Sequence, residues 1–563
     1  MNDDAATASA TTVYAARKII TMNPMQPEAT HVAVRDGRIL AVGSLAQVAS
    51  WGRYTLDERF KDKVLMPGLV EGHCHLKEGS MWDMPYLGWF DRRDPQGRVW
   101  PGLRSMDAVV QRLREVDAAM QSEGTPPDRP LIAWGFDPIY FGGERMTVEH
   151  LDQVGGARPI VISHANGHLM NVNSAMLRLA GIDHDNQVEG VLKFHSGPRA
   201  GEPNGELQEP AAMFQVIRKI GDAGLRSPVT PQGLRSFARL ACMQGVTTAT
   251  DLVNKLGADE CEVLERTLAD DAVPIRVLPA FQAFHGPLGA AQGAEHVKGL
   301  MGRNTDRLRY GLVKMMLDGS IQGFSARLRW PGHFNGAPNG IWVTAPAQFE
   351  EDFETYHRAG LTIHTHTNGD EASEVAIDAV ERVLTRAPRP DHRHTLQHGQ
   401  MIDAALFARM ARLGLCANLF ANHIWYWGDQ HYEVTMGPDR ANRIDACASA
   451  IAAGVALAIH SDAPVTPLGP LFTAWCAVNR VTPKDRVLGE SERISVAQAL
   501  HAITMGPAWT LKLDHEIGSI ECAKRADFCV LEDDPLAVDP MALKDLRVWG
   551  TVLSGRVFKA GPG

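Results

Sequence analysis

The chain has 563 residues, of which 45% are hydrophobic and 22% are charged, and its formal net charge is −10 at pH 7. This is an ordinary globular composition, and the length exceeds that of one typical domain, although a barrel with insertions can approach it. The acidic balance and the lack of any Lys/Arg run argue against a nucleic-acid partner. No apolar stretch reaches the roughly 18 residues of a transmembrane helix, so we expect no membrane partner.

The cysteines and the N-terminal residues indicate the compartment. The first seven residues are polar and acidic, without the basic and apolar segments of a signal peptide. No Cys-x-x-Cys pair occurs, which favours reduced thiols in a cytoplasmic protein over a disulfide framework or a Cys-zinc site. The eight cysteines stand at positions 74, 242, 261, 416, 447, 476, 522 and 529.

The two ends of the chain carry similar hairpin patterns. Residues 33–42 alternate around Asp36-Gly37, and residues 551–558 alternate around Ser554-Gly555. Asp-Gly between alternating apolar residues is a strong hairpin signal. The pattern predicts one small β-sandwich domain built from residues 1–65 and 511–563, with the rest of the chain inserted between its halves.

Between the ends, eight short apolar runs each lead to a polar or His/Asp/Gly tip. Several are followed by segments typical of helices, at 371–385, 404–413 and 442–453. Apolar strands that alternate with helices indicate a buried parallel sheet, and eight units predict an α/β fold of the (β/α)8 TIM-barrel type over residues 66–510. An open doubly wound sheet is the alternative, but no Gly-x-Gly-x-x-Gly loop follows the first run. The runs are 63–75, 245–251, 274–281, 311–318, 360–366, 394–398, 414–419 and 454–462.

The interval between the first and second runs is far longer than the others. Residues 76–240 contain a strand-like run of their own at 158–164, joined by Gly- and Pro-rich connectors. Long insertions in barrels usually fall in the βα loops that form the active-site face. We therefore expect a cap insertion that shapes the substrate pocket.

The strongest chemical feature is the pair His73 and His75 at the tip of the first run. Residues two apart in a strand point to the same side, so both imidazoles can reach one ion. Alone the pair is weak evidence, but further candidates lie at other tips. These are Lys314 in the fourth run, His364 and His366 in the fifth, His394 and His398 in the sixth, and His460 and Asp462 in the eighth. Because all these tips meet at one end of a barrel, the pattern predicts a metal centre.

Several motifs resemble the amidohydrolase superfamily, and within it the amidohydrolase 3 group that includes N-substituted formamide deformylases. The resemblance runs along nearly the whole chain. It rests on residues 66–75 (MPGLVEGHCH), 167–174 (GHLMNVNS), 313–320 (VKMMLDGS), 366–370 (HTNGD), 397–398 (QH), 461–464 (SDAP) and 517–527 (IGSIECAKRAD).

Taken position by position, the resemblance implies a binuclear centre. It assigns His73 and His75 to a buried metal, and His366 and His398 to a more exposed one. Asp462 is implied as a ligand and as the general base, then general acid, for a metal-activated hydroxide. Zinc is the default ion, and Mn, Fe or Co also fit such ligands.

The resemblance also implies that Lys314 is carboxylated and bridges the two metals. An ammonium group repels cations, whereas a carbamate is an anion with two oxygens that can bridge them. The alternative is a lysine that pairs with Asp318 or with a substrate carboxylate. An unmodified Lys314 would favour a mononuclear site.

The family motifs select His366 and Asp462 from their runs, and His394 is expected to point away from the metal. His364 and His460 then lie one layer deeper. We expect them to be hydrogen-bonded core groups or partners that orient the ligands. Four loop residues are candidates for substrate binding: His168, His423, Trp425 and Arg327. Each also has a structural alternative. His168 could bond the backbone and Arg327 could pair with Asp318. His423 and Trp425 could pack within their loop.

The expected activity is hydrolysis of a C–N bond in a small amide, N-formyl or N-acyl amine. A cyclic amide hydrolase or an aromatic amine deaminase on the same barrel is the alternative enzyme. A catalytically inactive scaffold is the alternative of another class, since fold alone does not imply function. The oligomeric state stays open, a homodimer included.

Overall fold

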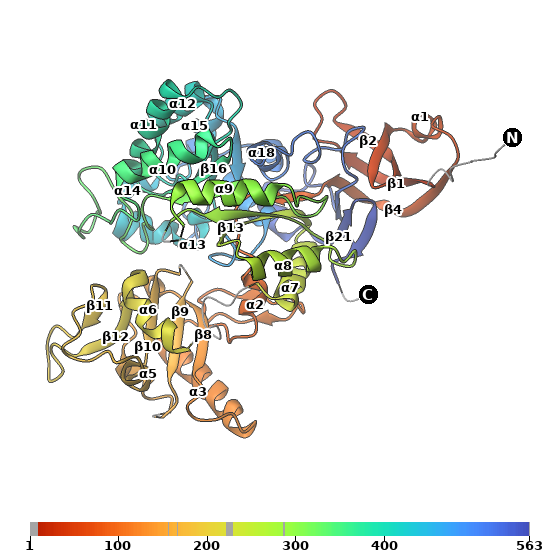
Figure 1. Cartoon of the computed structure of the whole chain (residues 1–563). Helices are drawn as coiled ribbons and strands as arrows, with labels where there is room; N and C mark the ends of the chain where they lie inside the picture. Colours follow the sequence, from red (N-terminus) through yellow and green to blue (C-terminus); the bar gives the residue numbers. More distant parts are fainter. Residues whose placement is uncertain are drawn as a thin grey trace. The chain divides into compact units, whose positions relative to one another are not determined.

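The computed structural model describes residues 10–155, 157–165, 167–220, 229–284, 286 and 288–561 (Figure 1). The N-terminal residues that bear on a signal peptide, and Asn166 beside His168, lie outside this set. The chain forms two compact units. The first comprises Met1–His75, Ala238–Ala463 and Leu468–Gly563, and the second comprises Leu76–Phe237 and Pro464–Pro467.

The first unit contains a curled sheet of eight parallel strands, and each apolar run of the sequence contributes one strand in chain order. Almost every strand residue is buried, as expected for a parallel sheet covered on both faces. The strands are β5 (Leu69–Glu71), β13 (Val246–Asn254), β14 (Arg276–Gln282), β15 (Leu312–Met316), β16 (Thr362–Thr367), β17 (Thr395–His398), β18 (Cys416–Leu419) and β19 (Leu457–Ile459).

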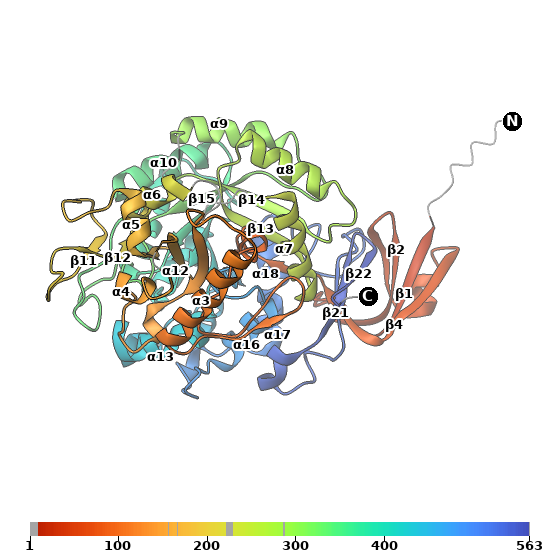
Figure 2. The ribbon, with the colours of Figure 1, turned by 90° about the horizontal axis from the view of Figure 1, so that it is seen from below.

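Amphipathic helices lie on the outside of this sheet. Figure 2 shows α8 (Ala258–Leu268), α9 (Ala290–Met301) and α10 (Pro346–Arg358) along the outer side of β13 to β15. They are followed by α11 (Asp370–Arg386) and α12 (Ala404–Leu413), which confirm the helices predicted there.

The helix predicted over 442–453 begins later than expected. The structure has a short α14 (Pro438–Ala441) and then α15 (Cys447–Ala452). Between them Asp445 adopts a positive φ of 46°, and its N–H donates to Gln400 O instead of continuing a helix. A left-handed residue interrupts the helical ladder, which the apolar spacing does not reveal.

The first run, predicted as one strand, is split in two. β4 (Tyr54–Pro67) belongs to another sheet, and the chain enters β5 only after Gly68. Gly68 N donates to Asp527 O, and the following N–H, of Leu69, donates to Gly245 O. A Cβ at position 68 would lie 2.0 Å from Thr247 Oγ1, so this crossover requires glycine.

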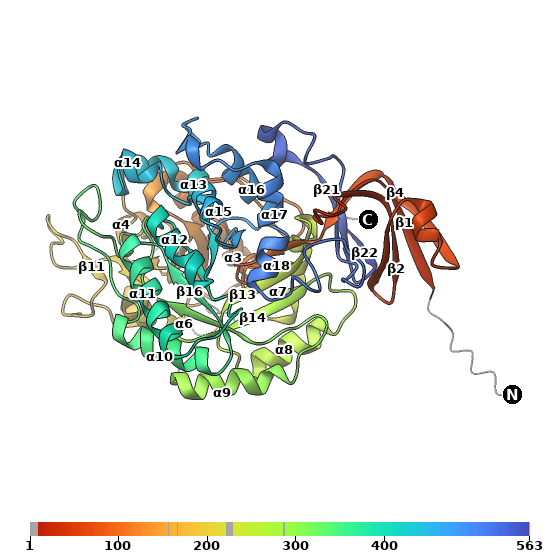
Figure 3. The ribbon, with the colours of Figure 1, turned by 90° about the horizontal axis from the view of Figure 1, so that it is seen from above.

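Both ends of the chain pair in one seven-stranded sheet (Figure 3), in the order β22-β21-β20-β4-β1-β2-β3. The predicted turns are present: Asp36-Gly37 and Ser554-Gly555 all have positive φ, which is the pattern of type I′ hairpins. The remaining strands are β1 (Thr11–Ile20), β2 (Glu28–Arg35), β3 (Arg38–Gly43), β20 (Phe528–Leu531), β21 (Val548–Leu553) and β22 (Arg556–Lys559).

A buried ion pair joins this sheet to the barrel within the first unit. Arg276 of β14 donates from Nη1 to Asp527 Oδ2 at 2.6 Å and to Thr248 Oγ1 at 3.0 Å. Both side chains of the pair are almost fully buried. Removing one partner of such a pair would leave an uncompensated charge in the interior.

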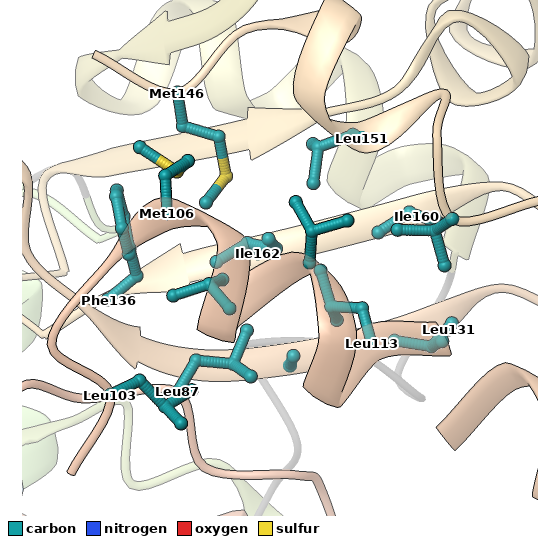
Figure 4. Close-up of a cluster of buried hydrophobic side chains, with 14 residues drawn as sticks. Leu87, Leu103, Met106, Leu113, Leu131, Phe136, Met146, Leu151, Ile160 and Ile162 are labelled. Carbon is teal, nitrogen blue, oxygen red and sulfur yellow. The ribbon is translucent and has the colours of Figure 1, made fainter. Parts of the chain in front are cut away.

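The second unit has its own sheet, in the order β11-β12-β10-β9-β8, and its own core. Helix α3 (Met106–Ser122) packs Met106 and Leu113 against apolar side chains of the sheet (Figure 4). The strands are β8 (Leu131–Phe136), β9 (Ile160–His164), β10 (Leu169–Val172), β11 (Val191–Lys193) and β12 (Pro203–Gln208). Along the described part of the chain, no helix combines the length and the apolarity needed to cross a membrane.

Three buried histidines lie at the N-terminal end of β17, away from the strand tips. His394 Nδ1 accepts from Ile363 N–H and leaves Nε2–H to face His357 Nδ1 at 2.9 Å. His357 Nε2 then donates to Ala387 O. His392 Nδ1 accepts from His394 N–H, and its Nε2 donates to Leu413 O. Each ring therefore uses one acceptor and one donor, which only the neutral form supplies.

This cluster predicts acid sensitivity. Burial lowers the pKa of His392 from 6.5 to about 4, and lowers those of His357 and His394, with Arg389 as a further cause. The folded protein then binds fewer protons than the unfolded chain between about pH 4 and 6.5. The free energy of unfolding should have its full value above pH 6.5 and should fall as the pH drops through this window. The protonation of His392 should account for about 3 kcal/mol of this loss.

Chemical denaturation between pH 4.5 and 8 measures this loss. The His392→Gln variant, which cannot gain the proton, should lose stability less steeply than the wild type over the same range. Equal slopes for the two proteins would contradict the assignment.

Candidate metal centre

Three candidate ligands meet where the edge strands of the barrel approach one another. His73 and His75 follow β5, and Asp462 follows β19. The Nε2 atoms of both histidines lie 3.3 Å from Asp462 Oδ1. Two ligands about 2.1 Å from a tetrahedral ion lie about 3.4 Å apart, so this spacing suits a shared metal.

The two histidines do not lie within a strand, contrary to the prediction. Cys74 between them forms an isolated bridge with Ala463, next to bonds from Asp462 N to His73 O and from His75 N to Ala463 O. The bridge holds this segment alongside residues 462–463. Both flanking imidazoles consequently reach the same oxygen of Asp462.

The protonation of His73 follows from its other nitrogen. His73 Nδ1 lies 2.7 Å from Gln397 Oε1, which can only accept, so the proton of a neutral ring is on Nδ1. The Nε2 lone pair then faces Asp462 Oδ1, a buried oxygen with no hydrogen-bond donor among the described residues. Two acceptors at this distance repel each other unless a cation lies between them. The residues present therefore fit a bound metal ion.

Gln397 is itself held from both sides. Its Nε2 donates to His364 Nδ1 at 2.8 Å, and its Oε1 also accepts from Asn418 Nδ2 at 2.9 Å. His364 Nε2 in turn faces Thr510 O at 3.4 Å. His364 is thus a hydrogen-bonded group one layer below the candidate ligands, which agrees with the expectation for it. Such partners fix the orientation and tautomer of a metal-ligating histidine.

His398 and His366 lie on the other side of Asp462. His398 Nδ1 is 3.7 Å from Asp462 Oδ2, and the rings of His398 and His366 are 4.4 Å apart. His366 Nε2 also contacts Gly319 O at 3.1 Å. His398 and Asp462 both have positive φ, of 66° and 52°. Strained backbone at two adjoining site residues is typical of functional sites.

Lys314 of β15 is 2% exposed, and its Nζ has no hydrogen-bond partner among the described residues. The alternative pairing with Asp318 does not form. Both Asp318 oxygens instead accept backbone N–H groups, those of Arg327, Asn368 and Gly369. Burial lowers the pKa of Lys314 to about 7, which makes the neutral, nucleophilic amine accessible near neutral pH. An orphaned buried amine of this kind fits a lysine that reacts with CO₂ to give a carbamate.

His460 differs from its expected role. Neither ring nitrogen has a hydrogen-bond partner among the described residues, so the expected hydrogen-bonded core group is wrong. Instead the ring stacks on His73 at 4.5 Å and on Phe420 at 4.9 Å, with interplanar angles of 14° and 16°. Parallel rings keep their in-plane lone pairs in separate planes. His460 and His73 are therefore poorly arranged to bind one ion together, although His73, His398 and His460 form a compact triplet.

The four candidate substrate residues have protein partners. His423 Nδ1 lies 3.3 Å from Asp445 Oδ1, and Trp425 packs on Phe472 and Trp475.

Arg327 pairs with Glu371 at 3.0 Å rather than with the Asp318 side chain, which accepts its backbone N–H. In the second unit, His168 Nδ1 lies 3.2 Å from Glu209 Oε2. The structure thus brings the predicted ligands together and gives the predicted substrate residues structural contacts.

Gln397 and Glu71 contact His73, although sequence reasoning assigned neither a role. The sequence contained one indication of such a role for both residues, because each is a polar residue inside a short, otherwise apolar strand. Strand alternation would place Gln397 and His398 on opposite faces, but the positive φ of His398 breaks that alternation, and both contact His73.

The sequence model of the Amidohydrolase family matches residues 60–558. The chain is 27% identical over 528 residues to Protein LONG AFTER FAR-RED 3 of Arabidopsis thaliana, covering 91% of this chain and 85% of that protein. It is 25% identical over 548 residues to the N-substituted formamide deformylase of Arthrobacter pascens, covering 93% and 94%. The crystal structure of an uncharacterized metal-dependent hydrolase from Pyrococcus horikoshii superposes with a TM-score of 0.68 at 20% identity, covering 94% and 99%. The chain belongs to the amidohydrolase family.

Proposed function

We propose that this protein is a metal-dependent hydrolase that cleaves a C–N bond in a small amide, N-formyl amine or N-acyl amine. The observation that carries the proposal is the unpaired Asp462 Oδ1, which faces the His73 and His75 Nε2 atoms at 3.3 Å. The orphaned amine of Lys314 supports it. Family membership and the named activity of the Arthrobacter relative suggest the bond type.

His73, His75 and Asp462 would hold a buried ion, and His366 and His398 a second one, with carboxylated Lys314 between them. Bound divalent ions, zinc by default, would supply Lewis acidity that lowers the pKa of water towards about 7 and polarises a carbonyl. Asp462 would accept the proton of the attacking water and deliver it to the leaving amine. Gln397 would keep His73 in the Nδ1–H tautomer throughout, because its Oε1 has no proton to give.

A cyclic amide hydrolase or an aromatic amine deaminase remains the alternative enzyme. Lys314 argues against a deaminase, because deaminases of the superfamily tend to bind a single metal and to have a Glu/His pair in place of the bridging lysine. An inactive scaffold is disfavoured because every position of the expected ligand set carries a residue that can bind a metal. His168, His423, Trp425 and Arg327 stay proposals as substrate contacts, and so does the cap insertion.

Metal analysis joined to a hydrolysis screen tests the proposal. The purified protein should contain about two divalent ions per chain, and mass or crystallographic measurement should detect a carbamate on Lys314. N-formyl and N-acyl amines should be hydrolysed, with cyclic amides and aromatic amines assayed in parallel. Lys314→Met, which keeps the volume but not the amine, should lose the second ion. A wild-type protein that binds no divalent ion would refute the proposal.

A further inference from the structure

The candidate ligands lie along a seam of the barrel. Seven neighbouring strand pairs in the eight-stranded sheet have backbone ladders, while within the described residues β19 and β5 form none. The single bridge between Cys74 and Ala463 lies beyond both strands. His73 and Asp462 stand on opposite sides of this seam, so the separation of its two edges sets the distance between their metal-binding atoms.

Glu71, the last residue of β5, connects the two edges with its side chain. Its Oε2 accepts from Ser461 Oγ at 2.7 Å, and its Oε1 accepts from Ser461 N–H at 3.2 Å. The same Oε1 accepts from His73 N–H at 3.4 Å. One carboxylate thus binds the backbone of one candidate ligand and the residue that precedes another.

The Glu71 carboxylate is an unusual choice for a purely structural contact. Glu71 is 1% exposed and makes no ion pair with a lysine, arginine or histidine in the described part of the chain. Burying a carboxylate without a cation is unfavourable, and an apolar contact usually closes a core at lower cost. A residue that breaks a packing rule beside a candidate site is more readily explained by function than by stability.

We propose that Glu71 is a positioning residue that fastens the barrel seam and thereby sets the spacing between His73 and Asp462. This inference rests on the proposed metal site. Glu71 acts through hydrogen-bond acceptance: its oxygens take the N–H groups of His73 and Ser461, which place the backbone on each side of the seam. It does not itself contact the ion.

The test compares metal affinity with overall stability. Zn²⁺ dissociation constants of folded, metal-free protein are measured by competition with a chromogenic chelator, and thermal unfolding of the same samples is recorded. Glu71→Leu should weaken Zn²⁺ binding about 10- to 100-fold, the range typical when a residue that orients a ligand is removed. Glu71→Gln retains an acceptor for both N–H groups and should stay within about threefold of wild type, since the Ser461 hydroxyl can turn to accept from the new amide.

Two further variants complete the design. Ser461→Ala removes one of the three bonds and should weaken Zn²⁺ binding by a smaller factor, and combining it with Glu71→Leu should add little. Asp527→Asn disrupts the remote buried pair with Arg276, so it should lower the melting temperature without changing Zn²⁺ affinity. If Glu71→Leu does not fold, Ser461→Ala decides the question.

Wild-type affinity in Glu71→Leu, or in Ser461→Ala when it must decide, would overturn the inference. Equal losses in Glu71→Gln and Glu71→Leu would also overturn it, because charge rather than hydrogen-bond acceptance would then be responsible. Failure of the wild type to bind Zn²⁺ refutes the proposed function instead.

Discussion

Asp462→Asn is expected to reduce turnover by about 10²- to 10⁴-fold, the range for loss of a general acid–base group, while the metal stays largely bound. The amide keeps the volume of the carboxylate and one oxygen that can still bind an ion. It cannot accept the proton of water or return it to the leaving amine. The measurement is kcat with metal content determined on the same preparation.

Asp378→Asn is a suitable control for this prediction. Asp378 lies on helix α11, pairs with Arg409 and is 41% exposed, so the same chemical change there leaves the candidate site untouched. Near-full activity in Asp462→Asn would end the assignment of Asp462 as the proton-transfer group. If that variant lost all of its metal, the loss of activity would show that Asp462 binds metal and would give no evidence that it transfers a proton.

The second large effect is expected from the double variant His73→Ala, His75→Ala. His73, His75 and Asp462 form one group of three candidate ligands, and removing the two histidines should abolish metal binding at the buried position as well as activity. Elemental analysis after dialysis, combined with the activity assay, measures both losses. Since the two rings are buried or nearly so, thermal unfolding must show that the variant still folds.

Replacing His184 and His515 by Ala provides the matched control. Both side chains are largely exposed, 70% and 68%, so this variant loses two histidines without touching the seam. It should retain wild-type metal content and activity. Full metal occupancy in His73→Ala, His75→Ala would show that the site lies elsewhere.

The pattern of buried strands was readable from the sequence because parallel strands are apolar on both faces. All eight runs contain a strand of the same sheet in the expected order, and the hairpin turns at Asp36-Gly37 and Ser554-Gly555 have the expected positive φ. The residues at which strands and helices begin and end were harder to predict from the sequence. The split at Gly68 depends on Thr247, a residue far away in sequence, and the late start of α15 depends on the conformation of Asp445.

By itself the sequence determined the order of the strands, which follows from local periodicity. Its motifs, through their resemblance to the amidohydrolase superfamily, indicated the family and implied which residues at the strand ends are candidate ligands. Only the tertiary structure decided which atoms face one another. The Nδ1–H tautomer of His73 depends on Gln397, 324 positions away, and the seam contact of Glu71 depends on Ser461, 390 positions away. The stacking of His460 likewise depends on Phe420 and His73. Such contacts arise from barrel closure, which brings distant segments together and which no local pattern encodes.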